Sequence, residues 1–349
     1  MRCYLFIADG EEEEHIALLL RHKVKELYGK SKVYFLSLQH PGVFAAQGFA
    51  EVSKERPQKA CGRWFVLLRD LWRRRRFRER RVFIGGNLLL LFLVVLLGGR
   101  KVTVVLSCGL HPFDLSFFRI FLLRRLARVV LADDASFVQL LRLRNIPAYF
   151  VGNILADLVQ TTETTFLHGK KPICALFPRR EHLREDLLFF LELVERIFER
   201  DASLYFLCSI PRGVSLDALR SIASEKGWVF LESFEGEVIE GYLVQKRAYV
   251  NLTHFSFEAL SEATYVVSAD RKTLIQAIGL GKTVVPVQVG KVAETVELFF
   301  HPVSLFEYNQ AMGAQFGRRG AMERMASFLL FGVVEDLELA HRLHLVRKG

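Results

Sequence analysis

One short stretch of the sequence limits the available folds more than any other part. Residues 265–289 read YVVSADRKTLIQAIGLGKTVVPVQV. An apolar run typical of a buried strand comes first, small and capping residues follow at 268–270, and apolar residues then recur at helical spacing up to Gly279 and Gly281. A second β-branched run follows at 283–287. This order predicts a tight strand–helix–strand unit, a building block of parallel sheets.

The turn inside this unit is also a candidate ligand site. The start of a helix exposes backbone N–H groups and the positive end of the helix dipole, so it can hold a phosphate when it follows a strand. The same pattern also occurs in strand–helix–strand units that bind nothing. Both interpretations stay open on this stretch alone.

The same alternation of apolar runs and helical patterns fills most of the chain. The clearest strand-like runs are at 3–8, 33–38, 102–106, 148–151, 173–177 and 204–209. The polar stretch at 161–171 shows neither pattern and predicts a linker. The sequence therefore predicts an α/β protein with two doubly wound, Rossmann-like domains facing each other across a cleft. The N-terminal domain covers 1–160 and the C-terminal domain covers 172–349, with the last helix able to pack back on the first domain.

The charge balance favours an anionic partner. Lys and Arg number 48 against 38 Asp and Glu, which gives the 349-residue chain a net charge of +10. Such a charge attracts nucleic acid, phosphates or an anionic membrane surface. The five cysteines are scattered without a CxxC pair, so they predict small buried side chains in a reducing compartment, not a disulfide set. The start of the sequence does not resemble a signal peptide, and we expect a cytoplasmic protein without a metal or another cofactor.

Acidic residues follow the first predicted strand. The run at 3–8 leads into DGEEEEH, and a helical pattern begins near Ile16. Residues between a parallel strand and its helix lie at the carboxyl edge of the sheet, where open α/β folds bind ligands. The acidic residues, Glu13 and Glu14 among them, are therefore candidate ligand contacts, with Gly10 beside them. The alternative is that the glutamates only complement the positive end of the helix dipole.

An arginine-rich segment beside an apolar one is the most unusual feature of the chain. Residues 64–81 read WFVLLRDLWRRRRFRERR, and residues 87–97 read NLLLLFLVVLL. The apolar run is too short to cross a bilayer, which takes about 20 residues. Together the segments are typical of a surface that docks on anionic lipid headgroups. A buried helix beside a solvated arginine face is the alternative, while nucleic-acid binding lacks a recognised motif. The candidate membrane contacts are Trp64, Trp72, Arg74, Arg75, Leu89 and Phe92.

Several motifs resemble, in order and spacing, those of the lipid-A-disaccharide synthase-related glycosyltransferases. AYFVGNILADLV at 148–159 resembles the family's VGNPxxD, and the preceding ADDASFVQLLRLRNIP resembles RDxxTAxxLRxRGVP. QAIGLGKTVV resembles QAVGLGKPVV, LFPRRE partly matches LLPGSR, and GGNLLLLFLVVLLGGRK resembles GDxxPLxxAWLSGRP. Residues 313–326 resemble GxxGAxxRIA. These matches cover most of the chain, and VGN-xx-D with GLGK is the best pair.

This resemblance implies a two-domain GT-B fold and sugar transfer from a UDP-sugar to a lipid-linked acceptor at the inner face of the membrane. Glu13 or Glu14 in the first domain would accept the proton of the acceptor hydroxyl. Asn87, Asn153 and Gly10 would lie on the acceptor side. The start of the helix at 270–280, with an arginine, would stabilise the departing UDP without a metal. The candidate donor-binding residues are Arg179, Arg180, Ser268, Ala269, Asp270, Thr273 and Gln276.

The chain departs from the family pattern at several positions. The opening NGHGED motif appears as DGEEEEH, Asn87 replaces the aspartate of GDxxP, and the small-residue loop GTAxT is replaced at 268–273. The acidic residue that holds the donor ribose in many GT-B enzymes would fall near Ile275 or Gln276. A glutamine bonds a hydroxyl more weakly than a carboxylate does. The alternative function is therefore a relative that binds a nucleotide-sugar or a lipid without turnover.

Overall fold

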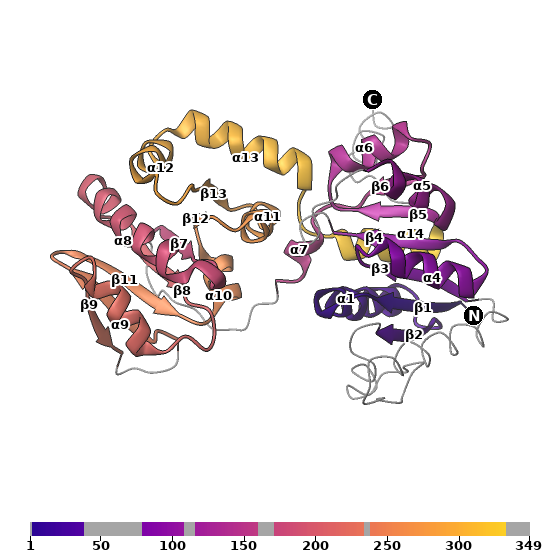
Figure 1. The fold of residues 1–349 in the computed structure, drawn as a ribbon, viewed down its shortest axis with the longest axis horizontal. Helices are drawn as coiled ribbons and strands as arrows, with labels where there is room; N and C mark the ends of the chain where they lie inside the picture. Colours follow the sequence, from indigo (N-terminus) through magenta and orange to yellow (C-terminus); the bar gives the residue numbers. More distant parts are fainter. Residues whose placement is uncertain (1, 38–78, 108–115, 160–170, 234–237, 333–349) are drawn as a thin grey trace, which may run out of the picture. The chain divides into compact units, whose positions relative to one another are not determined.

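The computed structural model describes residues 2–37, 79–107, 116–159, 171–233 and 238–332. The chain divides into two compact units, one formed by Met1–Leu158 with the chain from Arg319 onward, the other by Val159–Arg318 (Figure 1). The helix at 321–331 therefore belongs to the first unit. Most of the predicted linker lies outside the described residues, as do Trp64, Trp72, Arg74 and Arg75.

The first unit is built on a parallel six-stranded sheet. Its strands are β1 (Cys3–Ala8), β2 (Lys32–Ser37), β3 (Arg80–Ile84), β4 (Val102–Leu106), β5 (Ala127–Ala132) and β6 (Ala148–Phe150). They lie in the order β2-β1-β3-β4-β5-β6. The chain leaves β1 for β2 on one side and returns as β3 on the other. The topology therefore reverses between β1 and β3, the place where open α/β sheets bind ligands.

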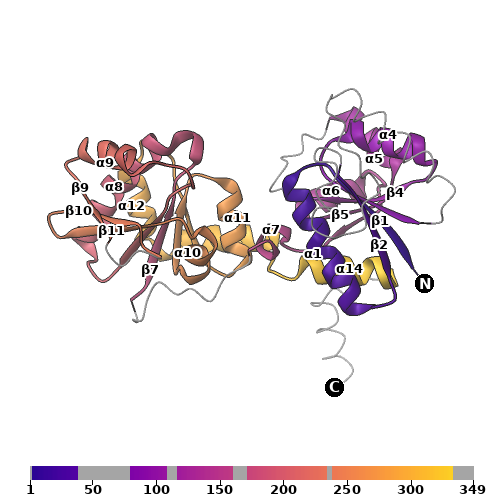
Figure 2. The ribbon, with the colours of Figure 1, turned by 90° about the horizontal axis from the view of Figure 1, so that it is seen from below.

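Helices cover both faces of this sheet (Figure 2). Tyr4 and Phe6 of β1 lie in the core beneath one helical layer, and Leu5 and Ile7 lie beneath the other. Burial on both faces explains why the strands read as continuous apolar runs. The first layer contains α1 (Glu11–Leu27), α7 (Ile154–Asp157) and α14 (Ala321–Phe331), and the second contains α4 (Leu88–Gly98), α5 (Phe117–Leu126) and α6 (Ala135–Leu143).

A buried carboxylate holds α14 in the first unit. Asp157 accepts hydrogen bonds of 2.7 Å from the backbone N–H groups of Gly320 and Met322 at the start of α14. Near the other end of this helix, the Tyr4 hydroxyl donates to the Leu329 carbonyl at 2.9 Å. The last described helix of the chain thus completes the core around its first strand.

The second unit is built on a mostly parallel seven-stranded sheet. Its strands are β7 (Ile173–Phe177), β8 (Tyr205–Ser209), β9 (Val229–Glu232), β10 (Gly241–Gln245), β11 (Ala248–Thr253), β12 (Tyr265–Ser268) and β13 (Thr283–Pro286). They lie in the order β13-β12-β7-β8-β11-β10-β9, and β10 runs antiparallel to both neighbours. The stretch at 234–253 has no clear pattern in sequence, yet it contains the β10–β11 hairpin. Its two-residue turn places Lys246 at φ 51°.

Helices again cover both faces, which confirms the predicted fold class for both units. One layer contains α8 (Leu183–Arg200), α9 (Leu216–Ser224) and α12 (Val292–Phe299). The other contains α10 (Ser256–Glu262), α11 (Arg271–Gly279) and α13 (Pro302–Phe316). Helix α13 continues through Gly313, although glycine is a poor helix former. It ends only where Gly317 takes φ 69°.

Candidate functional site

A pocket lies where the topology of the second sheet reverses. The chain leaves β7 for β8 on one side and returns as β12 on the other, so the carboxyl ends of β7 and β12 flank a crevice of the ligand-binding type. The pocket has a volume of about 370 Å³. Its lining is Phe177, Pro178, Arg179, Arg180, Glu181, Ser209, Pro211, Ser256, Phe257, Leu260, Asp270, Thr273 and Gln276.

The structure brings most of the predicted donor-binding residues together in this pocket. The loop after β7 contributes Arg179 and Arg180, and the start and first turns of α11 contribute Asp270, Thr273 and Gln276. Ser268 and Ala269 are not among its lining residues.

Ser268 instead has a structural role beneath the pocket. This residue is fully buried, and its hydroxyl donates to the Phe177 carbonyl and accepts from the Asp270 N–H, both at 3.0 Å. The bonds fix the end of β12 against the end of β7. The position favours a small hydroxyl residue for packing, so the functional interpretation of Ser268 is corrected to a supporting one.

The N-terminus of α11 is already capped from within the chain. The Asp270 carboxylate accepts from the backbone N–H groups of Lys272 at 3.3 Å and Thr273 at 3.0 Å, and from the Thr273 hydroxyl at 2.8 Å. Sequence reasoning expected a phosphate at these N–H groups. Because a carboxylate occupies them, the positive charge available to a phosphate in this pocket comes from side chains.

The two arginines after β7 differ in what they contact. Arg179 binds the fully buried Asp186 with two side-chain bonds of 2.7 and 2.9 Å, and its backbone N–H donates to the same carboxylate at 2.8 Å. These hydrogen bonds raise the pKa of Arg179. Arg180 is exposed, and within the described chain no carboxylate lies at ion-pair distance from it. Arg180 therefore has its charge available to an anionic ligand, while Arg179 holds the loop against α8.

Of the lining residues that the sequence analysis did not predict, three present groups that suit a ligand. Ser209 and Ser256 share a hydroxyl–hydroxyl hydrogen bond of 2.6 Å, and Phe257 presents a ring that is 41% exposed. Ser209 ends a predicted strand, so its place at the carboxyl edge could have been recognised. Ser256 and Phe257 lie in a stretch whose sequence pattern predicts no element.

The corresponding edge of the first sheet is closed by tight backbone contacts. The Asn87 N–H donates to the Asp9 carboxylate at 3.0 Å, and the Asp9 N–H donates to the Ile84 carbonyl at 3.1 Å. A Cβ at Gly85 would come within 2.3 Å of the Asp9 Cβ, and Gly85 has φ 150°. Only glycine fits there. The side chain of Asn87 caps α4, accepting from the N–H groups of its second and third residues.

Glu13 and Glu14 lie at this same edge, inside a helix that begins earlier than predicted. Helix α1 starts at Glu11 and not near Ile16, with Gly10 as its N-cap residue. Glu13 is 6% exposed, and Glu14 accepts a hydrogen bond from the Ser37 hydroxyl at the end of β2. The carboxylates therefore belong to the first turn of α1, where the dipole favours them. The catalytic role of Glu13 stays a prediction.

Asn153 is a helix cap and is fully buried, which corrects its predicted place in a cleft. Its side chain accepts from the Ala156 N–H at 2.8 Å. Gly152 before it takes φ 85°. Asp157, the last residue of the VGN-xx-D motif, binds the start of α14. In this chain the motif therefore joins α7 to α14.

An apolar surface runs along α4 and α5. One side of α4 is buried, with Leu91 and Val94 in the core, but its other side is exposed. The alternative of a buried helix is therefore correct for only one side of α4. No helix in the described ranges has the length and apolar character needed to cross a bilayer. The large exposed side chains of the two helices are Leu89, Phe92 and Leu96 on α4, and Phe117, Phe118 and Phe121 on α5.

A groove of about 600 Å³ lies within this surface and reaches the edge where β3 ends. It begins at Gly86 and Asn87 beside Asp9 and continues between the helices. Its polar end is thus at the topological reversal of the first sheet, and the rest of its lining is apolar except for Arg119. The remaining lining residues are Leu88, Leu89, Phe92, Phe118, Arg119 and Leu122.

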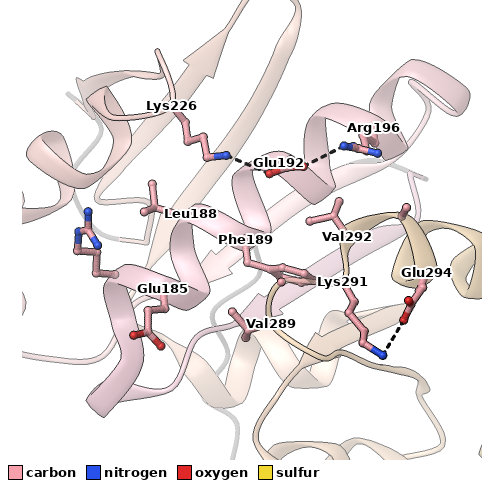
Figure 3. Close-up of a pocket in the computed structure, with 13 residues that line it drawn as sticks. Glu185, Leu188, Phe189, Glu192, Arg196, Lys226, Val289, Lys291, Val292 and Glu294 are labelled. Carbon is pink, nitrogen blue, oxygen red and sulfur yellow. Dashed lines mark hydrogen bonds and ion pairs between the residues drawn. The ribbon is translucent and has the colours of Figure 1, made fainter.

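A further pocket of about 550 Å³ lies between α8 and the loop from β13 to α12 (Figure 3). Most of its charged side chains already have partners. Glu192 binds both Lys226 and Arg196 at 3.0 Å, Lys291 binds Glu294 at 3.3 Å, and Arg184 binds Glu225 outside the pocket at 2.5 Å. Charges satisfied in this way attract a ligand weakly. The pocket at the end of β7 is therefore the better candidate, although it is smaller. Among the described residues, no group of three or more His, Cys, Asp or Glu side chains could hold a metal ion.

Neither a protein-family model nor the sequence of a curated protein matches the chain. Solved structures do. The UDP-GlcNAc 2-epimerase of Methanocaldococcus jannaschii has a TM-score of 0.60 and 13% identity, with 95% of this chain and 100% of that chain covered. The UDP complex of MnaA from S. aureus has a TM-score of 0.60 and 12% identity, covering 96% and 98%. The glycotransferase of kitacinnamycin has a TM-score of 0.51 and 12% identity, covering 94% and 98%.

These likenesses extend over nearly the whole of each chain, and they establish the fold. The protein has the two-domain, Rossmann-like GT-B arrangement. At identities of 12–13% the likeness does not carry activity from one protein to another.

Proposed function

We propose that this protein is a glycosyltransferase that transfers a sugar from a UDP-sugar to a lipid-linked acceptor at a membrane surface. The observation that supports the acceptor class is the groove between α4 and α5, which is polar at Asn87 and, apart from Arg119, apolar beyond it. An amphiphile has the same division, with a polar head and an apolar tail. The fold is consistent with the donor class, since the MnaA structure described above contains UDP.

The donor would bind in the pocket at the end of β7. Arg180 supplies a cation for the diphosphate, and Phe257 supplies an aromatic face for a planar ring. The hydroxyl groups of Ser209 and Ser256 and the side chain of Gln276 offer hydrogen bonds to a sugar. A pocket with one cationic side, one aromatic side and several hydroxyls suits a nucleotide-sugar.

The reaction would need a base and a group that stabilises UDP as it leaves. We assign the base to Glu13, which would accept the proton of the acceptor hydroxyl. The acceptor oxygen would then bond to the anomeric carbon as the bond from that carbon to the β-phosphate oxygen breaks. The negative charge that develops on UDP would be stabilised by Arg180.

The apolar surface of α4 and α5 would dock on an anionic membrane. Phe117 is 83% exposed and Leu89 is 67% exposed, which is unusual for side chains of this size unless they meet an apolar partner. Arginines stand among them on α5: Arg119 lines the groove, and Arg124 and Arg125 lie in the last turn. Exposed rings beside basic side chains are the combination that binds anionic lipid headgroups.

Two other functions fit part of the structure. Epimerisation of a UDP-sugar is favoured by the likeness to UDP-GlcNAc 2-epimerases, and it requires no lipid acceptor. Binding without turnover is favoured because neither Ile275 nor Gln276 is acidic, although many GT-B enzymes carry an acidic residue near this position.

Incubation of the protein with a panel of UDP-sugars, followed by nuclear magnetic resonance, separates the three. A transferase releases UDP only when a lipid-linked acceptor is added, and this is the result we expect. A new epimer of the sugar without UDP release would replace our proposal with epimerisation. Stabilisation by UDP without any reaction would favour the non-catalytic function.

A further inference from the structure

A second, strongly basic pocket lies at the opposite edge of the first sheet. All six strands of this parallel sheet begin at the same edge, away from Asp9 and Asn87. The pocket has a volume of about 520 Å³, and the last turn of α14 forms one wall of it. Its cationic lining residues come from the starts of four strands: Arg2, Arg80, Arg81, Arg100, Lys101 and Arg128.

The charged side chains that line this pocket are mostly positive. Glu79 is the acidic residue among its lining, against six cationic side chains. Like charges that share a cavity repel one another, so an arrangement of this kind costs stability unless an anion is present. One carboxylate can neutralise one of the six.

The simplest structural explanation is that the cations complement the C-terminus of α14. Basic side chains near a helix C-terminus do bond its last carbonyls. Arg80 fulfils this role, because its guanidinium donates to the Leu329 carbonyl at 2.7 Å. One arginine is enough for this purpose, and in the described part of the chain Arg100 and Arg128 donate no hydrogen bond to the helix.

Arg2 gives the most direct indication that this pocket binds a ligand. Its guanidinium lies 5.7 Å from the ring centre of Tyr28 and 5.8 Å from that of Phe331, so the aromatic rings hold it in place. Its Nη1 atom is buried and has no hydrogen-bond partner within the described part of the chain. A buried donor without a partner is unfavourable, and an anion would satisfy it.

One side of the pocket is aromatic. Tyr149 and Phe328 both line it, with their ring centres 5.2 Å apart, and Tyr149 is 37% exposed. The pocket therefore combines a cluster of cations with a flat apolar side, and its volume exceeds that of a single phosphate.

We infer that this pocket binds a ligand carrying more than one phosphate charge, at a site separate from the donor pocket. Arginine is the side chain best matched to phosphate oxygens, because its planar guanidinium donates two parallel hydrogen bonds. The phosphates could belong to a soluble molecule or to a lipid headgroup, and both offer the same chemistry to the arginines. The inference does not depend on the proposed glycosyl transfer.

Isothermal titration of the full chain with inorganic pyrophosphate tests the inference. The double variant Arg100→Gln/Arg128→Gln removes two exposed cations of the pocket whose loss should leave the core intact. We expect it to bind pyrophosphate at least about tenfold more weakly than the wild type. The matched control, Arg144→Gln/Arg247→Gln, removes two exposed arginines elsewhere and should bind as the wild type does.

A third variant tests whether pyrophosphate binds in the donor pocket, at the end of β7, and not in the basic pocket. Arg180→Ala should leave pyrophosphate binding at the basic pocket unchanged, even where it weakens UDP binding. Absence of pyrophosphate binding, an equal loss in the control pair, or loss in Arg180→Ala would each overturn the inference. Sedimentation with vesicles containing phosphatidic acid then identifies the source of the phosphate. Vesicle binding that needs Arg100 and Arg128 supports a lipid headgroup, and vesicle binding independent of them, with pyrophosphate binding retained, supports a soluble ligand.

Discussion

At the scale of single residues, neighbouring side chains of the same type have different roles. Arg179 and Arg180 are adjacent, but only the first binds the buried Asp186. Ser268 and Ser209 both end strands of one sheet, yet Ser268 is sealed beneath the pocket and Ser209 lines it. The chemistry of the donor pocket is therefore decided by which groups already have partners inside the protein.

Replacing Arg180 tests the assigned phosphate contact. Arg180→Ala should weaken UDP binding at least about tenfold, because a charge-assisted hydrogen bond to a phosphate contributes about 1.5–3 kcal/mol. The free energy of unfolding should change by less than about 0.5 kcal/mol, since the side chain is exposed. Titration calorimetry with UDP measures the first quantity, and Arg247→Ala, which removes an exposed arginine from the β10–β11 turn, is the control. UDP affinity that is the same in all three proteins would remove Arg180 from the site.

The proposed base is tested by a substitution that keeps its shape. Glu13→Gln should lower turnover by about 10² or more and leave UDP affinity unchanged, because the amide cannot accept the proton of the acceptor hydroxyl. Glu11→Gln, which alters an exposed residue two positions earlier in the same turn, should behave as the wild type does. Unchanged turnover in Glu13→Gln would exclude this carboxylate as the base.

At the scale of elements, the first unit depends on a helix that follows the whole second unit in sequence. Helix α14 packs beside α1 and receives its N-terminal cap from Asp157. Burial raises the pKa of this carboxyl group, while its two backbone hydrogen bonds and the nearby arginines oppose that shift. The VGN-xx-D motif and the segment before α14 are far apart in the sequence, and this contact brings them together in the folded chain.

Removing the cap should loosen this attachment. We expect Asp157→Ala to lower the free energy of unfolding by about 1–2 kcal/mol, the usual cost of losing a helix N-cap. Denaturant unfolding measures the change. Asp217→Ala removes an exposed aspartate from the first turn of α9 and should cost less than about 0.5 kcal/mol. Equal stability of the two variants would show that the cap contributes little.

Periodicity predicted the elements well where burial controls the pattern. Most of the strands follow from apolar spacing alone, because both faces of each sheet are covered, but the β10–β11 hairpin does not. Helix α13 was missed because the glycine at 313 lies in an open part of its surface, where a missing side chain costs little packing. The start of α1 was placed too late, because glutamates in a first turn look like a loop.

Spacing also placed five of the predicted donor-binding residues in one pocket, but it could not separate ligand contacts from internal bonds. Asp270, Asn87 and Asn153 all cap helices. A residue type that suits a ligand also suits a helix end, and only the hydrogen-bond geometry tells them apart.

At the scale of the whole molecule, the proposed transfer to a lipid-linked acceptor requires the protein to bind a membrane surface. Leu96→Glu/Phe117→Glu places two charges on the exposed apolar surface without altering residues that line the groove. Binding to vesicles with anionic lipid should fall at least about tenfold, since each large apolar side chain contributes about 1.5–3 kcal/mol when it is buried. The control Val303→Glu/Phe306→Glu alters two equally exposed side chains on α13. If it loses as much binding as the α4–α5 variant, the proposed docking surface is wrong.

The most direct test of the central claim follows the sugar itself. The protein is incubated with a radiolabelled UDP-sugar and with anionic vesicles that carry a lipid-linked sugar acceptor, and the products are partitioned between water and organic solvent. We expect label to enter the organic phase for one UDP-sugar of a panel, and we expect Glu13→Gln and Arg180→Ala both to reduce the amount. Label that stays in the aqueous phase for every donor and acceptor, while UDP still binds, would contradict the central claim.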